Sequence, residues 1–170
     1  YCSGLTSVTI GNGVTSIGDR AFSGCDSLQF VTIPNRVTIE ECIVTYDCNS
    51  ITIITLPDTI TTIDSNAFAD CKGLTNVTLP SSVAEIGVRA FADCSSLVEI
   101  TLPDSVTKVG ELAFNGCYRL PISGGIRYAG SYLLEVVDSS LSSYTIKDGT
   151  RFIGALAFYG CSNMASLTIP

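Results

Sequence analysis

Hydrophobic and polar positions follow a repeating order along most of the chain. The stretch Val77-Thr78-Leu79 alternates apolar, polar and apolar side chains, which is typical of a half-buried strand. The same order, with Thr always in the middle, returns at residues 8–10, 31–33, 54–56, 100–102, 144–146 and 167–169. Most of these stretches are 23 residues apart. Because a fixed period of this size is the signature of stacked repeats, the sequence predicts a solenoid.

The rest of each repeat predicts two further elements. An apolar pair such as Val83 and Ile86 indicates a brief strand on the opposite wall, and a glycine that permits a sharp corner commonly follows it. Ala90, Phe91 and Cys94 are then spaced three and four apart, which predicts one or two turns of helix. Whole repeats begin near residues 5, 28, 51, 74, 97 and 141. We therefore expect residues 1–170 to form a single solenoid, as a segment of a longer array.

The repeat that begins at Leu28 keeps its length but loses the pattern in its middle. Glu40 stands where other repeats have an inward-pointing Ile, and Thr45 stands where they have Phe. A carboxylate buried without a partner is costly, so we expect the backbone between Val37 and Cys48 to shift.

A second interruption separates Cys117 from Cys161, which are 44 residues apart instead of 46. Two apolar stretches within residues 125–137 flank Ala129-Gly130-Ser131. A glycine in such a tight turn predicts a β-hairpin, which we place within about residues 121–140. This hairpin is expected to replace the turn and helix of one repeat.

Cysteine marks the period most plainly, since it recurs every 23 residues at positions 2, 25, 48, 71, 94 and 117. In stacked parallel strands equivalent side chains point the same way, so their Cβ atoms stay about 5 Å apart, where a disulfide needs about 3.8 Å. The spacing therefore favours buried, reduced thiols over disulfides. Cys42 lies off this column, and it either pairs with Cys48 or is free, which we favour.

Composition excludes several functions. The net charge of −7, with only nine Lys and Arg residues, argues against nucleic acid as a partner. No apolar run approaches the roughly 20 residues of a membrane span. The chain has no His, which removes the commonest general base and metal ligand. The acidic column Asp47, Asp70 and Asp93 suits either a weak cation site or, as we favour, a solvated corner. We therefore expect no enzyme activity, no cofactor and no metal.

The repeat pattern L-x-x-V-T-I-P-x-x-V-T-x-I-G-x-x-A-F-x-x-C resembles that of the BspA-like leucine-rich repeat family, most clearly in residues 74–96 and 97–119. The resemblance implies an α/β repeat fold, a right-handed leucine-rich repeat solenoid. Its parallel sheet would form the concave face, with short convex strands, short helices and one inserted hairpin. It also implies a cell-surface or secreted protein, because several members of the family are adhesins for host matrix proteins.

The outer face of the long strands is the natural binding surface of such a solenoid. Beside the Thr column runs a variable column that contains Phe30, Ile53, Asn76 and Glu99. Phe30 and Ile53 belong to adjacent repeats, and an exposed apolar pair there indicates either a ligand contact or incidental exposure.

A second candidate patch lies in the hairpin, where Arg127, Tyr128 and Tyr132 are joined by Tyr144 of the next strand. Tyr and Arg are common at contact sites, although the same residues could pack on the solenoid instead.

These features lead to a non-enzymatic protein-binding or adhesion module as the expected function, with a host or matrix protein as partner. The alternative is a structural spacer within a larger cell-surface protein. Both ends of the sequence fall in mid-repeat without a polar cap, so we also expect end-to-end self-association.

Overall fold

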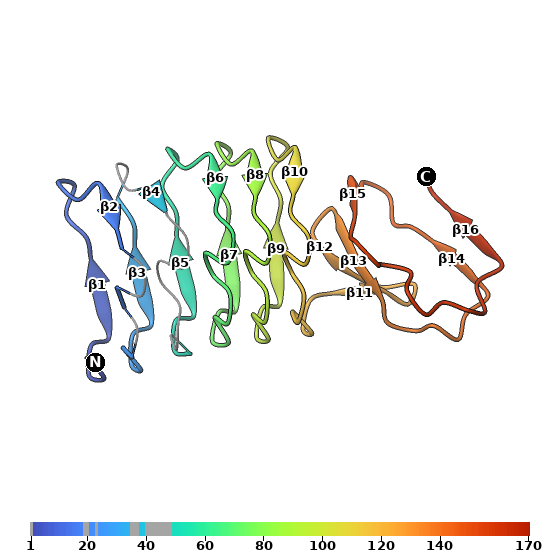
Figure 1. The fold of residues 1–170 in the computed structure, drawn as a ribbon, viewed down its shortest axis with the longest axis horizontal. Coiled ribbons are helices and arrows are strands. Elements are labelled where there is room, and N and C mark those ends of the chain that lie inside the picture. The colour runs from blue at the N-terminus through green and yellow to red at the C-terminus, as the bar shows by residue number, and fades with distance from the viewer. Residues whose placement is uncertain (1, 19–20, 23, 35–37, 40–48) are drawn as a thin grey trace.

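The computed structural model describes residues 2–18, 21, 22, 24–34, 38, 39 and 49–170. The chain winds into a rod in which long strands form one wall and short strands form another (Figure 1). The predicted irregular middle of the Leu28 repeat, including Glu40, Thr45 and Asp47, and the thiols of Cys42 and Cys48 lie outside the described residues.

Long strands stack in parallel as the sequence predicts. They are β1 (Ser7–Thr9), β3 (Phe30–Thr32), β5 (Ile53–Thr55), β7 (Asn76–Thr78) and β9 (Glu99–Thr101), and they form one sheet in that order. Each strand pairs with the equivalent residues of the next repeat, so that Thr55 lies opposite Thr78 and Thr78 lies opposite Thr101. The Thr ladder and the stacking of successive repeats are therefore confirmed.

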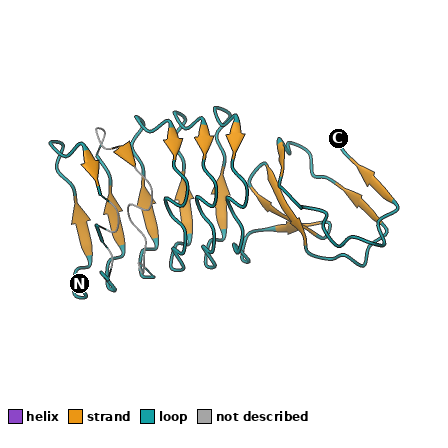
Figure 2. Cartoon of the chain, viewed as in Figure 1, coloured by secondary structure: helices purple, strands orange, loops and turns teal. Residues whose placement is uncertain are grey.

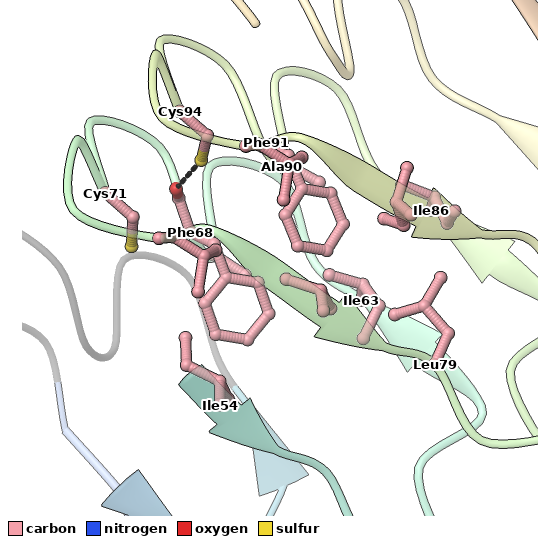
Figure 3. Packing of buried hydrophobic residues seen from close by; sticks show 14 of the residues in the cluster. Ile54, Ile63, Phe68, Cys71, Leu79, Ile86, Ala90, Phe91 and Cys94 are labelled. Carbon is pink, nitrogen blue, oxygen red and sulfur yellow. Dashed lines mark hydrogen bonds between the residues drawn. The ribbon is translucent and has the colours of Figure 1, made fainter. Parts of the chain in front are cut away.

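Short strands form the second wall, which confirms the brief strand predicted from the apolar pair. They are β2 (Ser16–Ile17), β4 (Thr38–Ile39), β6 (Thr62–Ile63), β8 (Glu85–Ile86) and β10 (Lys108–Val109). Pairing is again parallel and in register, with Ile63 opposite Ile86 and Ile86 opposite Val109. The two walls enclose an apolar interior only one side chain deep from each side (Figure 3).

The predicted short helices are wrong: in the part of the chain that the structure describes, turns replace them (Figure 2). We call the segment that follows each short strand, where the helix was expected, the corner segment. Alternate amides of this segment point toward the next coil: the N–H groups of Phe68 and Asp70 donate to the carbonyls of Ala90 and Ala92, both at 2.8 Å. An α-helix keeps every such bond within its own segment. The alternation requires a left-handed backbone at Asn66 (φ 59°) and Asp70 (φ 61°). Bonding between coils therefore displaces the helix that the three-four spacing suggested.

Two of the glycines that follow short strands, Gly87 and Gly110, have a different role from the expected corner. Gly87 and Gly110 are not among the residues with positive φ. A Cβ on Gly110 would instead lie 2.4 Å from the amide nitrogen of Val88 in the preceding coil. Glycine is needed here because the backbones of adjacent coils approach so closely that no room is left for a Cβ atom.

The core is a set of columns that run along the rod. Phe68, Phe91 and Phe114 are fully buried, and their rings stack at centroid distances of 5.2 and 5.5 Å. The cysteines form a neighbouring column (Figure 3). Cys25, Cys71, Cys94 and Cys117 are buried and free of disulfides, which confirms the reduced thiols expected from their spacing.

The predicted hairpin is confirmed, although it occupies the wall of short strands and not only the turn. It consists of β12 (Ile126–Ala129) and β13 (Tyr132–Val136), with β11 (Ile122–Ser123) antiparallel beside β12. β13 pairs in parallel with β15 (Phe152–Ile153), so it takes the place of a short strand in the stack. The sheet of long strands stops at β9, and β14 (Ser143–Thr145) and β16 (Ser166–Thr168) form a separate pair.

Two arginines hold this interruption in place. Arg151 donates to the carbonyls of Pro103 at 3.1 Å, Asp104 at 2.9 Å and Val106 at 2.5 Å, which joins the coil after the hairpin to the coil before it. Arg127 lies in the hairpin and donates to Glu135 of the facing strand and to the carbonyl of Leu120 before the hairpin.

Candidate functional site

The outer face of the long strands presents two exposed columns beside one buried column. In β3, β5, β7 and β9 the first and third residues are exposed and the second is buried. The buried residue anchors each strand to the core, because its side chain points inward while its two neighbours point outward. The third residue is always Thr, so all variation on this face lies in the first column.

The four residues predicted in this first column are brought together by the register of the sheet. Phe30 lies opposite Ile53, Ile53 opposite Asn76, and Asn76 opposite Glu99. Phe30 is 50% exposed and Ile53 is 47% exposed, although both are large apolar side chains. The sequence therefore placed these four residues correctly on one continuous surface.

Two shallow hollows cross this surface between neighbouring strands. The larger, about 590 Å³, lies between β5 and β7 and is lined by Ile53, Thr55, Asn76, Thr78 and, at its end, Asp58 and Pro80. The smaller, about 390 Å³, lies between β7 and β9 and is lined by Asn76, Thr78, Glu99, Thr101 and Pro103. Asn76 and Thr78 line both, so the two hollows lie on either side of β7. Sequence reasoning missed Asp58, which follows the strand and lines the larger hollow.

The hairpin patch does not form a surface. Tyr128 is 2% exposed, Tyr132 is 4% exposed and Arg127 is 7% exposed, so the expectation of a second contact site is corrected to a packing role. The ring of Tyr132 lies between Phe114, at 5.6 Å, and Phe152, at 6.5 Å, and continues the aromatic column of the core. Tyr144 is buried as well, and its hydroxyl donates to the carbonyl of Asp138 at 2.6 Å.

Arg127 is buried because each side of its guanidinium has a partner. Its Nε donates to the Glu135 carboxylate at 2.9 Å, and Nη1 donates to the carbonyls of Leu120, at 3.0 Å, and Tyr118. Loss of the Glu135 carboxylate would leave the buried guanidinium without its counter-charge, which is costly, whereas Glu135 itself is 45% exposed. Arg127 therefore fastens the hairpin to the chain that precedes it.

A third hollow, about 230 Å³, lies on the turn side of the rod beside the hairpin. Leu112, Leu156 and Tyr159 are among its lining residues, and the last two are 75% and 84% exposed. Leu112 and Leu156 also have left-handed backbones, with φ of 55° and 59°. Sequence reasoning missed this cluster. The left-handed backbone that sets the direction of Leu112 and Leu156 follows from hydrogen bonds between coils, and leucine itself gives no sign of such a backbone.

The thiols of the core are buried and hydrogen-bonded. The thiol of Cys94 donates to the carbonyl of Phe68 at 3.1 Å (Figure 3). The thiol of Cys117 donates to the carbonyl of Phe91, also at 3.1 Å. The pKa of Cys117 is raised far above its ordinary value by its contact with Cys94 and by burial, so it carries no reactive thiolate. Within the described ranges, no group of three or more Cys, Asp or Glu side chains is placed to hold a metal ion.

The acidic corner has a structural explanation. Asp70 and Asp93 have left-handed backbones, and the equivalent positions hold Gly24, Gly116 and Gly160, all with positive φ. Gly and Asp both tolerate this conformation, which is the signal in the sequence that distinguishes the corner from a helix. Asp93 also forms an ion pair with Arg89 at 3.2 Å. Asp70 and Asp93 therefore serve the turn, in agreement with the corner that we favoured.

No helix in the described part of the chain has the length and apolar character needed to cross a bilayer.

Solved structures share this fold. TpLRR, a leucine-rich repeat protein of T. pallidum, is 28% identical and superimposes with a TM-score of 0.61 over 91% of this chain and 63% of its own. A leucine-rich repeat protein from Eubacterium ventriosum ATCC 27560 is 29% identical, with a TM-score of 0.57 over 70% of this chain and 32% of its own. A leucine rich cell surface protein from Faecalibacterium prausnitzii A2-165 shares the fold at 23% identity, with a TM-score of 0.54 over 96% of this chain and 60% of its own.

The chain thus spans 63% of the length of TpLRR. Comparison with curated protein sequences gave no significant match. The profile of the BspA type leucine rich repeat region matches residues 1–121 and 122–170, in six copies. The repeat, the stacked strands and this match agree, and the chain belongs to the BspA-type leucine-rich repeat family.

Proposed function

We propose that this chain is a non-enzymatic binding module of a cell-surface protein, and that the outer face of β3, β5, β7 and β9 contacts a protein ligand. The observation that carries the proposal is the exposure of Phe30 and Ile53, at 50% and 47%, side by side on that face. Large apolar side chains in adjacent exposed positions suit a contact surface better than a purely structural wall.

Two further features support this proposal. The hollows between β5, β7 and β9 give the face concave places for ligand side chains, and Asn76 lines both hollows. Leucine-rich repeats of this family are generally scaffolds for protein–protein contact, and the F. prausnitzii relative is described as a cell surface protein. An extended parallel sheet is the surface that solenoids commonly use for binding.

Alanine substitution tests the proposal. Phe30→Ala and Ile53→Ala should each weaken capture of the chain by an immobilised extracellular-matrix protein by about fivefold or more, because truncating a contact residue at an interface centre costs more than about 1 kcal/mol. Val88→Ala is the matched control, since Val88 is also an exposed apolar residue, at 45%, but follows a short strand. Full capture of both the Phe30→Ala and the Ile53→Ala variants would show that the face is not the contact site.

The structural spacer is the second candidate, favoured by the unbroken register of the strands from β1 to β9. Deletion of residues 74–96 separates the two functions. A spacer should keep its role with one coil fewer, whereas a binding face loses β7 and with it both hollows.

A further inference from the structure

The outer face changes character along the rod. Its variable column runs from two apolar side chains, Phe30 and Ile53, through the amide of Asn76 to the carboxylate of Glu99. The inference that follows rests on the proposed function of this face, and it concerns which kind of polypeptide segment binds there.

The charged side chains that the structure describes on this face have one sign. In the described segments 6–11, 29–34, 52–58, 75–81 and 98–104, which make up the long strands and their flanks, every charged side chain is a carboxylate: Asp58, Glu99 and Asp104. Asp104 is compensated by Arg151, whose Nη1 lies 3.5 Å from it. Asp58 and Glu99 remain, and each lines one of the two hollows. Complementary charge on a ligand would therefore be positive.

Backbone pairing limits how a ligand can bind. β3, β5 and β7 each pair with a strand on both sides, so their N–H and C=O groups are already used by the sheet. A ligand on this part of the face can therefore reach it only through side chains. The two exposed columns are about 6.8 Å apart, the distance between alternate residues of a strand, which suits an extended chain better than a helix about 10 Å wide.

Spacing sets the pattern of the ligand. Neighbouring strands are about 4.8 Å apart, so Phe30 and Glu99, three strands apart, are separated by about 14 Å. In an extended chain, side chains on one side repeat every two residues, about 6.7 Å, and residues i and i+4 are about 13 Å apart. The first side chain would cover Phe30 and Ile53 while the second reaches Glu99.

We propose that the ligand is an extended, basic protein segment in which an aliphatic or aromatic residue lies four positions from a Lys or Arg, in either chain direction. The apolar side chain rests on Phe30 and Ile53, and the cation lies beside Glu99. Asn76 and Thr78 accept or donate hydrogen bonds between these two ends.

Selection from a random fifteen-residue peptide library displayed on phage, long enough to present either spacing, tests this proposal with the whole chain as bait. The expected result is enrichment of peptides that carry a net positive charge and an apolar residue four positions from Lys or Arg. A separation of eight or nine residues would indicate a helical ligand and overturn the extended geometry. Enrichment of neutral or acidic peptides, or no enrichment over an unrelated bait, would also overturn it.

Charge reversal provides the second arm. Glu99→Lys should weaken binding of an enriched peptide by about five- to tenfold at low salt and remove most of its salt dependence, because exposed charge pairs are screened. Glu111→Lys is the matched control, since Glu111 is exposed on the turn side of the rod, and should leave affinity within about twofold. Equal effects of the two variants would mean that only the net charge of the chain matters and would overturn the proposal.

Failure of this inference is distinguishable from failure of the proposed function. A captured matrix protein that depends on Phe30 and Ile53 but is insensitive to salt and to Glu99→Lys would retain the binding face while excluding a basic ligand. Binding of uncharged glycans in place of peptides, tested on a glycan array, would likewise exclude the basic segment.

Discussion

The protonation state of the buried cysteines is set by the stacking of the coils. Cys94 and Cys117 are fully buried, each beneath a coil that supplies a carbonyl acceptor for its thiol. The pKa of Cys117 is raised by its contact with Cys94 and by burial. For Cys94, the contact with Cys117 lowers the pKa, but the contact with Cys71 and burial raise it by more. Both thiols therefore stay neutral well into alkaline solution while the chain is folded.

This neutral state predicts a loss of stability at high pH. The ordinary pKa of both thiols is 9.0, and folding raises it, so above pH 9 the unfolded chain releases protons that the folded chain keeps. Each thiol then lowers the free energy of unfolding by about 1.4 kcal/mol per pH unit, and contributes no pH dependence well below pH 9. Urea unfolding at pH 7, 9, 10 and 10.5 under reducing conditions measures this slope.

Alanine variants assign the slope to these two residues. Cys94→Ala and Cys117→Ala should each be less stable at pH 7, because a buried side chain is truncated, yet each should have an alkaline slope shallower by about 1.4 kcal/mol per pH unit. Cys2→Ala is the control, since Cys2 is exposed, and should leave the slope unchanged. Slopes that are the same in all four proteins would contradict the neutral buried thiols.

Among the elements, the glycine that follows β10 shows most clearly that one coil constrains the next. Gly110→Ala should destabilise the chain by about 1–3 kcal/mol, because the added Cβ would lie 2.4 Å from the backbone of Val88. Gly18→Ala is the matched control, since Gly18 holds the same place in its repeat but nothing lies within 4 Å of its Cβ position. Thermal or urea unfolding compares the two. Equal costs would mean that the glycine is needed for the corner and not for the approach of the coils.

Elements whose shape depends on their own residues could be predicted from the sequence. Alternation around Thr78 predicted the long strands, the apolar pair at Val83 and Ile86 predicted a short strand, and Gly130 predicted the hairpin turn, where φ is 59°. The corner segment could not be predicted in this way. Its three-four spacing is genuine, but its amides bond to the next coil, and periodicity within one segment contains no information about that partner.

The same limit explains the outcome for the candidate site. Phe30, Ile53, Asn76 and Glu99 were placed correctly because the register of the sheet follows directly from the 23-residue period. Arg127, Tyr128 and Tyr132 were misplaced because their burial depends on how the hairpin packs between coils, which no period describes. All four residues of β12 are buried, so both faces of this strand are covered.

At the scale of the whole molecule, the hairpin divides the interior into two apolar clusters. The first extends from Ile17 to Leu120 and includes Ala129 and Tyr132 of the hairpin. The second contains Ile126, Tyr128 and Leu133 of the hairpin, with Tyr144, Ile146 and Ala157. The hairpin strands thus contribute side chains to both clusters. Because repeat proteins are stabilised mainly by contacts between neighbours, such a partition creates a boundary between cooperative units.

This boundary predicts that the two parts of the rod can unfold separately. Tyr144→Ala removes a buried ring from the second cluster and should destabilise it by about 3–5 kcal/mol. Native-state hydrogen exchange should then show accelerated exchange in β14 and β16 but unchanged protection in β5 and β7. Val77→Ala, in the first cluster, is the complementary variant, and it should accelerate exchange in β5 and β7. If Tyr144→Ala lowered protection equally in all four strands, the rod would unfold as one unit across the hairpin, and the second cluster would be an extension of the first.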